Sequence, residues 1–71
     1  MHVIRKNARE SIRLQMTDFR GATFLDVRIW ADHGEGEAKP TTKGVTVPLA
    51  ALPAFVQAVA SIGREERLQA A

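Results

Sequence analysis

Residues 18–47, DFRGATFLDVRIWADHGEGEAKPTTKGVTV, form the stretch that decides the fold. From Thr23 to Trp30, apolar residues alternate with polar or aromatic ones, which is typical of a strand with one face on a core. Asp18–Gly21 before this strand predicts a turn, because glycine adopts positive φ without steric cost. Asp32–Glu37 after it has glycines among polar residues and predicts a hairpin loop.

The sequence before and after this segment supplies the remaining strands. Ser11–Thr17 shows the same alternation with a period of two, and Val3–Asn7 is a candidate first strand. Val45–Val47 predicts a short final strand. Pro40 cannot donate to a sheet ladder, so the stretch Lys39–Gly44 is expected to start on an edge or at a bend.

The last third of the chain has the apolar spacing of an amphipathic helix. We expect this helix to begin between Ala50 and Pro53, with Gly63 as its C-cap and Arg64–Ala71 as a charged tail that extends it or frays. Four strands followed by one helix predict an α+β domain with an antiparallel sheet. The residues expected to pack together are Leu25, Val27, Ile29, Val45 and Val47 from the strands with Leu52, Phe55, Val56 and Val59 from the helix.

The length of 71 residues sets a limit on stability. A domain of this size buries only about 60% of the surface of its unfolded chain, and small folds commonly add disulfides, a metal or a partner subunit. The chain has no cysteine and no close cluster of metal ligands. One helix also leaves part of a four-stranded sheet uncovered, and the small Ala54 and Ala58 beside Phe55 permit close approach. We therefore expect a homodimer that forms through the helix.

Charge is distributed unevenly along the chain. Residues 1–30 have six Arg and Lys residues against three acidic ones, a net charge of +3, whereas residues 31–71 have a net charge of −1. A basic, strand-rich first half permits a polyanionic partner. No apolar run has the ~18 residues of a membrane span, and the first residues lack the apolar core of a signal peptide, so a soluble, non-secreted protein is expected.

Aromatic and cationic side chains share one predicted strand face. Phe24, Arg28 and Trp30 alternate on one strand, and Arg13 occupies the equivalent face of the preceding strand. Single-stranded nucleic acid offers flat bases to aromatic rings and phosphates to cations. The alternative is a face buried against a partner subunit with its charges at the rim. The candidate nucleic-acid-binding residues are Arg13, Phe19, Arg20, Arg28, Trp30, Lys39 and Lys43.

Two other groups of residues have simpler interpretations. Asp32, His33, Glu35 and Glu37 could suggest a metal site, but a glycine-rich loop has no fixed geometry, and a solvated turn is the favoured interpretation. Asp26 is expected to form an ion pair with a neighbouring arginine. No nucleophile, metal constellation or phosphate loop is present, so no enzyme, cofactor or metal is predicted.

The sequence resembles one family of transcriptional coactivators. The segments that match are IRLQMTDFRG at Ile12–Gly21, LDVR at Leu25–Arg28, GE-x-KP at Gly36–Pro40 and KGVTV at Lys43–Val47. This ordered set resembles the positive cofactor four family over about residues 9–62. The resemblance implies a curved four-stranded antiparallel sheet followed by one helix, and homodimers packed through the helices and adjoining sheet. It also implies grooves that bind single-stranded DNA, often as two antiparallel strands or a melted duplex, with little sequence specificity.

Site residues follow from the resemblance by position. Phe19 is similar to the family's stacking aromatic at the turn and Arg28 to its sheet-face arginine. Lys39 and Lys43 resemble its lysines around the last strand, and Trp30 matches an aromatic position. Ala22 and Ala31 depart from the family, since they stand where a lysine and a second aromatic can occur. The long Ser- and Lys-rich regulatory tail of eukaryotic members is missing, so the chain is more similar to bacterial or phage members.

These observations give one leading hypothesis for residues 1–71 as a single domain. It is a homodimeric, non-enzymatic module that binds single-stranded DNA without sequence preference, in transcription regulation or in replication and repair. Its expected location is the cytoplasm or nucleoid of a bacterium, or otherwise a nucleus, with no membrane partner. The alternatives are a protein-interaction module that contacts the transcription machinery, and a duplex DNA or RNA binder that uses the same face.

Overall fold

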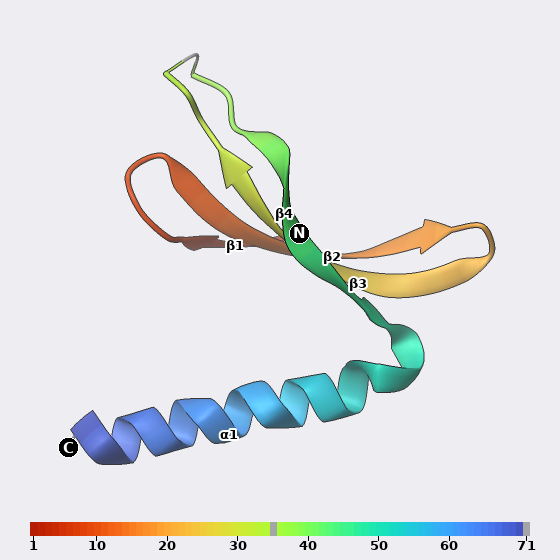
Figure 1. The fold of residues 1–71 in the computed structure, drawn as a ribbon, viewed down its shortest axis with the longest axis vertical. Coiled ribbons are helices and arrows are strands. Elements are labelled where there is room, and N and C mark those ends of the chain that lie inside the picture. The colour runs from red at the N-terminus through yellow and green to blue at the C-terminus, as the bar shows by residue number, and fades with distance from the viewer. Residues whose placement is uncertain (35, 71) are drawn as a thin grey trace.

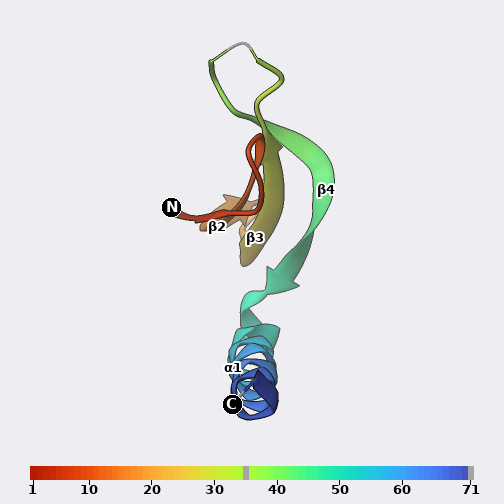
Figure 2. The same ribbon diagram turned by 90° about the vertical axis from the view of Figure 1, so that its left-hand side faces the viewer.

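The computed structural model describes residues 1–34 and 36–70 (Figure 1). The elements in order are β1 (His2–Arg5), β2 (Glu10–Phe19), β3 (Ala22–Ala31), β4 (Lys39–Pro48), a 3₁₀ turn (Leu49–Ala51) and α1 (Leu52–Ala70). The strands form one antiparallel sheet in the order β1-β2-β3-β4. The sheet is strongly curved, and Figure 2 shows β4 bending along its length. The predicted α+β class, with four antiparallel strands followed by one helix, is confirmed.

The turn between β2 and β3 is tighter than the sequence suggested. Arg20 and Gly21 both have positive φ, 53° and 79°, as a two-residue type I′ turn requires. Phe19 therefore already pairs with Ala22 at the end of the hairpin, and the Thr23 hydroxyl donates to Asp18 Oδ1 at 2.6 Å. The turn lies where it was predicted, but the strands extend further into it on both sides.

β4 is longer than the predicted Val45–Val47. It begins at Lys39, and Pro40 pairs with Trp30, because β4 is an edge strand on which a proline nitrogen can face solvent. The expected bend is present as an irregularity in the pairing between Arg28 and Trp30. The prediction of a short last strand was wrong because a bulged edge strand can accept a proline and extra residues.

Gly44 lies where β4 comes closest to β3. A Cβ atom at this position would lie 2.5 Å from the Val27 carbonyl oxygen and 3.0 Å from the Arg28 Cα. Real side chains do not tolerate such distances to backbone atoms, so only glycine fits here.

Strand pairing sorts the side chains of the sheet onto two faces, since residues paired across antiparallel strands point to the same side. One face, the apolar face, consists of Ile12, Leu14, Met16, Leu25, Val27, Ile29, Val45 and Val47. The other, the arginine face, consists on β2 and β3 of Ser11, Arg13, Gln15, Thr17, Phe19, Phe24, Asp26, Arg28 and Trp30. The prediction that Arg13 shares a face with Phe24, Arg28 and Trp30 is confirmed.

α1 begins at Leu52, within the predicted range, and continues to Ala70. The prediction that Gly63 caps the helix was wrong, whereas the alternative that the following residues extend the helix is confirmed as far as Ala70. A glycine cap needs left-handed φ, and Gly63 is not among the glycines with positive φ. The helical penalty of glycine, about 1 kcal/mol, is too small to end a helix that continues into good helix formers. No helix within residues 1–34 and 36–70 is both long and apolar enough to cross a membrane.

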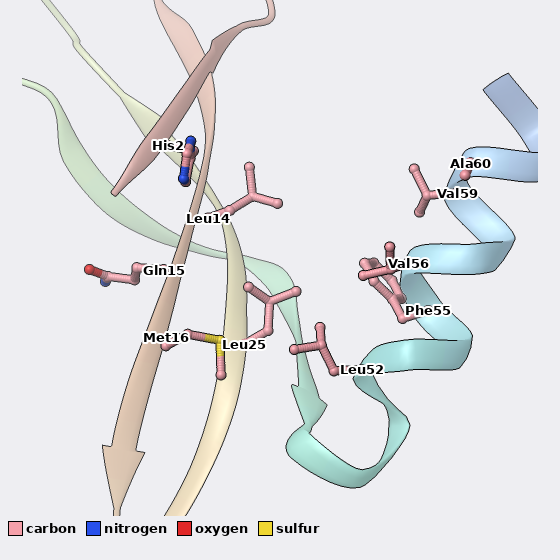
Figure 3. Close-up of a pocket in the computed structure, with 10 residues that line it drawn as sticks. All are labelled: His2, Leu14, Gln15, Met16, Leu25, Leu52, Phe55, Val56, Val59 and Ala60. Atoms are coloured by element: carbon pink, nitrogen blue, oxygen red, sulfur yellow. The ribbon is translucent and has the colours of Figure 1, made fainter.

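The helix stands away from the sheet (Figures 1 and 2). An apolar groove of about 530 Å³ separates it from the apolar face, and in Figure 3 Leu14 and Leu25 face Leu52 and Val56 across it. Gln15, on the arginine face, points to the opposite side of the sheet. The helix therefore lies on the side of the apolar face.

One chain does not form a closed core. Among the described side chains only Ser11, Ala31 and Val47 are buried, whereas Val56 and Val59 are 56% and 55% exposed. The expectation that the strands pack directly beneath Leu52, Phe55, Val56 and Val59 therefore holds only at the start of α1, where Leu52 and Phe55 are half-buried. After Pro48 and the 3₁₀ turn, the rest of the helix lies away from the strands (Figure 1).

Asn7 holds the turn between β1 and β2. Its Oδ1 accepts hydrogen bonds from the backbone N–H groups of Arg9 at 3.0 Å and Glu10 at 2.9 Å, and its amide donates to Glu10 Oε1 at 2.8 Å. The bond from Asn7 and then the charges of Lys6 and Lys43 lower the pKa of Glu10 below its ordinary 4.5. Asn7 therefore both holds the backbone of the turn and stabilises the charged form of Glu10.

Replacing Gly44 by alanine should destabilise the fold by roughly 1–3 kcal/mol, because β4 must move away from β3 to admit the methyl group. Chemical denaturation at fixed protein concentration measures the change. Gly63→Ala is the matched control. No atom lies within 4 Å of a Cβ there and the residue is helical, so we expect stabilisation of about 0.5–1 kcal/mol. Equal effects of the two substitutions would contradict the close approach at Gly44.

Replacing Asn7 by alanine should cost about 1 kcal/mol through the two lost bonds to the Arg9 and Glu10 N–H groups. It should also raise the pKa of Glu10 in the folded protein, which an NMR titration of the side-chain carboxyl measures. Because the folded pKa of Glu10 is depressed, the stabilisation from its charge is present above pH 4.5 and is lost as the pH falls through the folded pKa. Asn7→Asp keeps the backbone cap but adds a carboxylate, so there too the pKa should rise. A Glu10 pKa that both substitutions leave unchanged would exclude Asn7 as its main cause.

Candidate nucleic-acid interface

Arg13 and Arg28 are direct cross-strand partners in the middle of the arginine face. Like charges placed opposite each other destabilise a sheet, so each guanidinium needs partners of its own. The structure supplies two separate sets of contacts. Arg28 reaches toward Asp26 along its own strand, whereas Arg13 reaches in the other direction, toward the row of Ser11 and Trp30. The two charges are therefore drawn apart along the strands.

Arg28 is held by one carboxylate and one backbone carbonyl. Its Nη2 lies 3.0 Å from Asp26 Oδ1, its Nε donates to Asp26 Oδ2 at 3.3 Å, and its Nη1 donates to the Thr41 carbonyl oxygen at 2.8 Å. The predicted ion pair of Asp26 is confirmed. The Arg28 and Asp26 side chains are 27% and 14% exposed, so the pair is half-buried and still reaches solvent. A guanidinium has five N–H donors, and these three bonds leave donors for an incoming anion.

Arg13 lies over the ring of Trp30. Its Cζ is 4.4 Å from the ring centroid, which is a cation–π contact, and its Nε donates to the Ser11 hydroxyl at 3.1 Å. Ser11 pairs with Trp30 across the strands and is 2% exposed. The three side chains form one packed unit, and one side of the Trp30 ring faces a guanidinium.

Phe19 and Arg20 lie at the tip of the β2–β3 hairpin. Phe19 is 60% exposed, and the Arg20 Cζ lies 5.1 Å from its ring centroid. The hairpin end therefore presents an open aromatic ring with a cation beside it. Strands rise about 3.3 Å per residue, so the six residues from Phe19 to Arg13 span up to ~20 Å along β2.

The arginine face orders these groups into cross-strand rows. From the hairpin tip inward the rows are Phe19 with Ala22, Thr17 with Phe24, Gln15 with Asp26, Arg13 with Arg28, and Ser11 with Trp30. Aromatic rings thus stand at both ends, and the two arginines lie next to the inner one. Such a surface can bind an extended polyanion that has flat groups at intervals.

The two lysines lie apart from these rows. Lys39 pairs with Ala31, whose side alternates with that of Trp30, so β4 directs it toward the face that Ile29 occupies. Lys43 follows the irregular part of β4, and its charge contributes to lowering the pKa of Glu10 at the start of β2. The register places the start of β4 beside Trp30 and Ala31, but it does not bring Lys39 into the arginine face.

Sequence reasoning missed the residues that organise the two arginines. Ser11 obeys the period-two alternation of β2 and could have been placed on the arginine face by that signal. Thr41 could not, because it contacts Arg28 through its backbone oxygen at an irregular point of β4, where the Thr41 hydroxyl also donates to the Ile29 carbonyl at 2.8 Å. The identity of a side chain, here threonine, does not predict that its backbone carbonyl will accept a hydrogen bond from Arg28.

The loop after β3 has a local structural role. Asp32 Oδ1 accepts a hydrogen bond from the Gly34 N–H at 2.8 Å, and the Asp32 N–H donates to the Arg9 carbonyl at 2.8 Å. Within the described part of the chain, no three His, Cys, Asp or Glu side chains are grouped to hold a metal ion. Glu35, which belonged to the loop considered for a metal, lies outside the described residues.

Solved structures share this fold. A PC4 homolog from Burkholderia pseudomallei is 26% identical with a TM-score of 0.82, covering 92% of this chain and 88% of its own. A bacteriophage T5 homolog of the eukaryotic transcription coactivator PC4, implicated in recombination-dependent DNA replication, is 23% identical with a TM-score of 0.60 over 96% of this chain and 84% of its own. MoSub1, in a complex with single-stranded DNA, is 24% identical with a TM-score of 0.63, covering 94% of this chain and 77% of its own.

The sequence itself identifies the family. No curated protein matches the chain. The sequence profile described as "Transcriptional Coactivator p15 (PC4)" matches residues 6–58, which extend from the β1–β2 turn into α1 and include both arginines of the face. Profile and fold agree over most of the chain, and the protein therefore belongs to the PC4 family.

Proposed function

We propose that this protein binds single-stranded DNA, without catalysis and without sequence preference, through the arginine face. The observation that supports this most directly is the order of the rows, in which Arg13 and Arg28 lie between the aromatic rings of Phe19 and Trp30. On this face the proposed contacts to the DNA come from Arg13, Phe19, Arg20 and Arg28, with Trp30 beside Arg13 as part of the same site. Lys39 and Lys43 on the neighbouring edge strand β4 are proposed to add positive charge for the phosphates outside the face. MoSub1, a protein of the same fold, has been crystallised with single-stranded DNA, which supports the choice of ligand.

The chemistry of the face favours single strands over duplex. An exposed ring such as that of Phe19 binds an unpaired base through its π-face, and a base inside a duplex offers no such surface. Every base has a π-face, and phosphates are the same along the chain, so contacts of these two kinds do not discriminate between sequences. Among the proposed contacts, the arginines and lysines are the main groups that could read base edges, and Arg28 already donates three hydrogen bonds to Asp26 and Thr41.

We further propose that the binding unit is a homodimer whose second copy covers the apolar face and α1. The chain exposes 5677 Å², whereas a compact monomer of 7.8 kDa exposes about 4,400 Å². The excess of roughly 1,300 Å² is larger than the ~800 Å² that each partner buries in a standard interface. Val56, Val59 and Ile62 are all more than half exposed and follow one helical stripe, so a second copy would find a continuous apolar surface.

Fluorescence anisotropy of labelled oligo-dT at several salt concentrations tests the proposed ligand. We expect log K to fall linearly with log salt, with a slope of roughly −0.7 per phosphate neutralised. Arg28→Gln should weaken binding about tenfold and reduce the slope by about 0.7, because one charge-assisted contact is lost. Arg64→Gln removes the same charge from α1, where the Arg64 Nη2 donates to the Ser61 hydroxyl at 3.0 Å, and should leave the slope unchanged.

Arg28 also neutralises Asp26, so Asp26→Asn combined with Arg28→Gln serves to separate folding from binding. The combined variant should be as well folded as the wild type by circular dichroism and still bind weakly. A flat salt response, equal affinity for duplex of the same length, or equal effects of Arg28→Gln and Arg64→Gln would contradict binding of single strands at the arginine face. Co-purification of a polypeptide without any oligonucleotide binding would favour a protein-interaction module instead.

Sedimentation equilibrium tests the proposed dimer. The wild type should have the mass of two chains, and Val59→Glu should reduce it to one, because a charge buried without a partner costs several kcal/mol. Gln57→Glu places the same carboxylate on α1 away from the apolar stripe and should leave the dimer intact. A wild-type mass of one chain at every concentration would exclude a stable homodimer.

A further inference from the structure

Trp30 is already in contact with a cation of its own chain. The Arg13 Cζ lies 4.4 Å from its ring centroid, and across the strands Trp30 pairs with Ser11 on one side and Pro40 on the other. The side chain is half-buried. A base that stacked on the covered side of this ring would have to displace the guanidinium. Phe19, by contrast, is 60% exposed at the hairpin tip.

Arg13 gains a fixed position from this arrangement. A free arginine side chain loses rotamer freedom when it binds a phosphate, and that loss opposes binding. Here Trp30 lies beneath the guanidinium plane and the Ser11 hydroxyl accepts from Nε at 3.1 Å, so the side chain is ordered before any ligand arrives. Within the described residues, Ser11 is the hydrogen-bond partner of Arg13, through Nε, which leaves the two Nη atoms for a phosphate. The contacts with Trp30 and Ser11 therefore order the Arg13 side chain and leave its Nη donors available to a phosphate.

The second arginine makes this ordering necessary. Arg28 is the cross-strand partner of Arg13, and an unrestrained Arg13 would be repelled by a charge held in place by Asp26 and Thr41. Contact with Trp30 keeps the Arg13 guanidinium near the row of Ser11, away from the row of Asp26. The face then offers two separate cationic positions along the strands.

We propose that Trp30 acts in DNA binding as a positioning residue for Arg13, and that it is not a base-stacking surface. This assignment rests on the proposed binding of single-stranded DNA. It makes Arg13, Trp30 and Ser11 one functional unit, in which Arg13 alone touches the phosphate.

A double-mutant cycle on oligo-dT affinity tests the assignment. The four proteins are the wild type, Arg13→Ala, Trp30→Leu and the double variant. If Trp30 acts through Arg13, each single substitution weakens binding, and Trp30→Leu costs less than twofold once Arg13 has been replaced. If Trp30 stacks on a base, its removal costs about 5- to 150-fold in both backgrounds. Independent, additive losses would overturn the proposal.

Ser11→Ala gives a second route in case Trp30→Leu does not fold. It removes the acceptor for Arg13 Nε without touching the ring. We expect it to weaken oligo-dT binding in the wild-type background and to have no effect in the Arg13→Ala background. Weaker binding in both backgrounds, at unchanged melting temperature, would overturn the role of this unit in positioning Arg13.

The single tryptophan and the absence of tyrosine allow a direct optical readout. A stacked base quenches the emission of an indole ring, so saturating oligo-dT should change the emission of the wild type only slightly. Strong quenching that persists in Arg13→Ala would identify a stacked base and overturn the proposal. If the wild type does not bind oligo-dT, both the proposed function and the role of Trp30 are overturned. If it binds, but the Arg13 and Trp30 substitutions weaken binding additively, only the role of Trp30 is overturned.

Discussion

The uninterrupted pairing of β2 with β3 is the constraint on which the rest of the structure depends. All ten residues of each strand are in register, from Glu10 with Ala31 to Phe19 with Ala22. The type I′ turn at Arg20 and Gly21 fixes that register, and a slip by one residue would move every side chain to the other face. Arg13 would then join the apolar face. The separation of an apolar face from a cationic one is therefore a direct product of one tight turn.

Much of this could be predicted from the sequence, and the failures have physical reasons. The alternation of Thr23–Trp30 and Ser11–Thr17 predicted both the hairpin and the face shared by Arg13 and Arg28, because period two is a local property. The full length of β4 was missed because Pro40 and the bulge break the local pattern, while edge pairing with β3 is a tertiary effect. The helix end was missed because a glycine such as Gly63 can remain helical. The contact of Arg28 with the Thr41 main-chain oxygen could not be predicted, because the side chain of a residue does not indicate what its backbone carbonyl binds.

The two sides of the sheet differ in what they contact. α1 leaves β4 on the side of the apolar face, so the helix and the exposed valines lie opposite the arginine face (Figure 3). Within one chain, apolar side chains such as Val56 and Val59 are more than half exposed, and the proposed second copy would complete the core. Stability should accordingly depend on protein concentration, since association adds the missing burial. The arginine face needs no contribution from that interface, because its partners Asp26, Thr41, Ser11 and Trp30 all belong to the same chain.

The placement of the two faces on opposite sides of a single sheet has a consequence for avidity. In the proposed dimer the cationic faces point outward and are present twice, related by a two-fold axis and held at a fixed spacing by the shared core. A flexible strand that is long enough to reach from one to the other makes its second contact at a high effective concentration, whereas a short oligonucleotide binds each face independently. Rigid duplex cannot bend as easily between them. In the proposed dimer, a sheet with one side for assembly and the other for ligand would combine two modest binding surfaces into one bivalent protein that favours long, flexible strands.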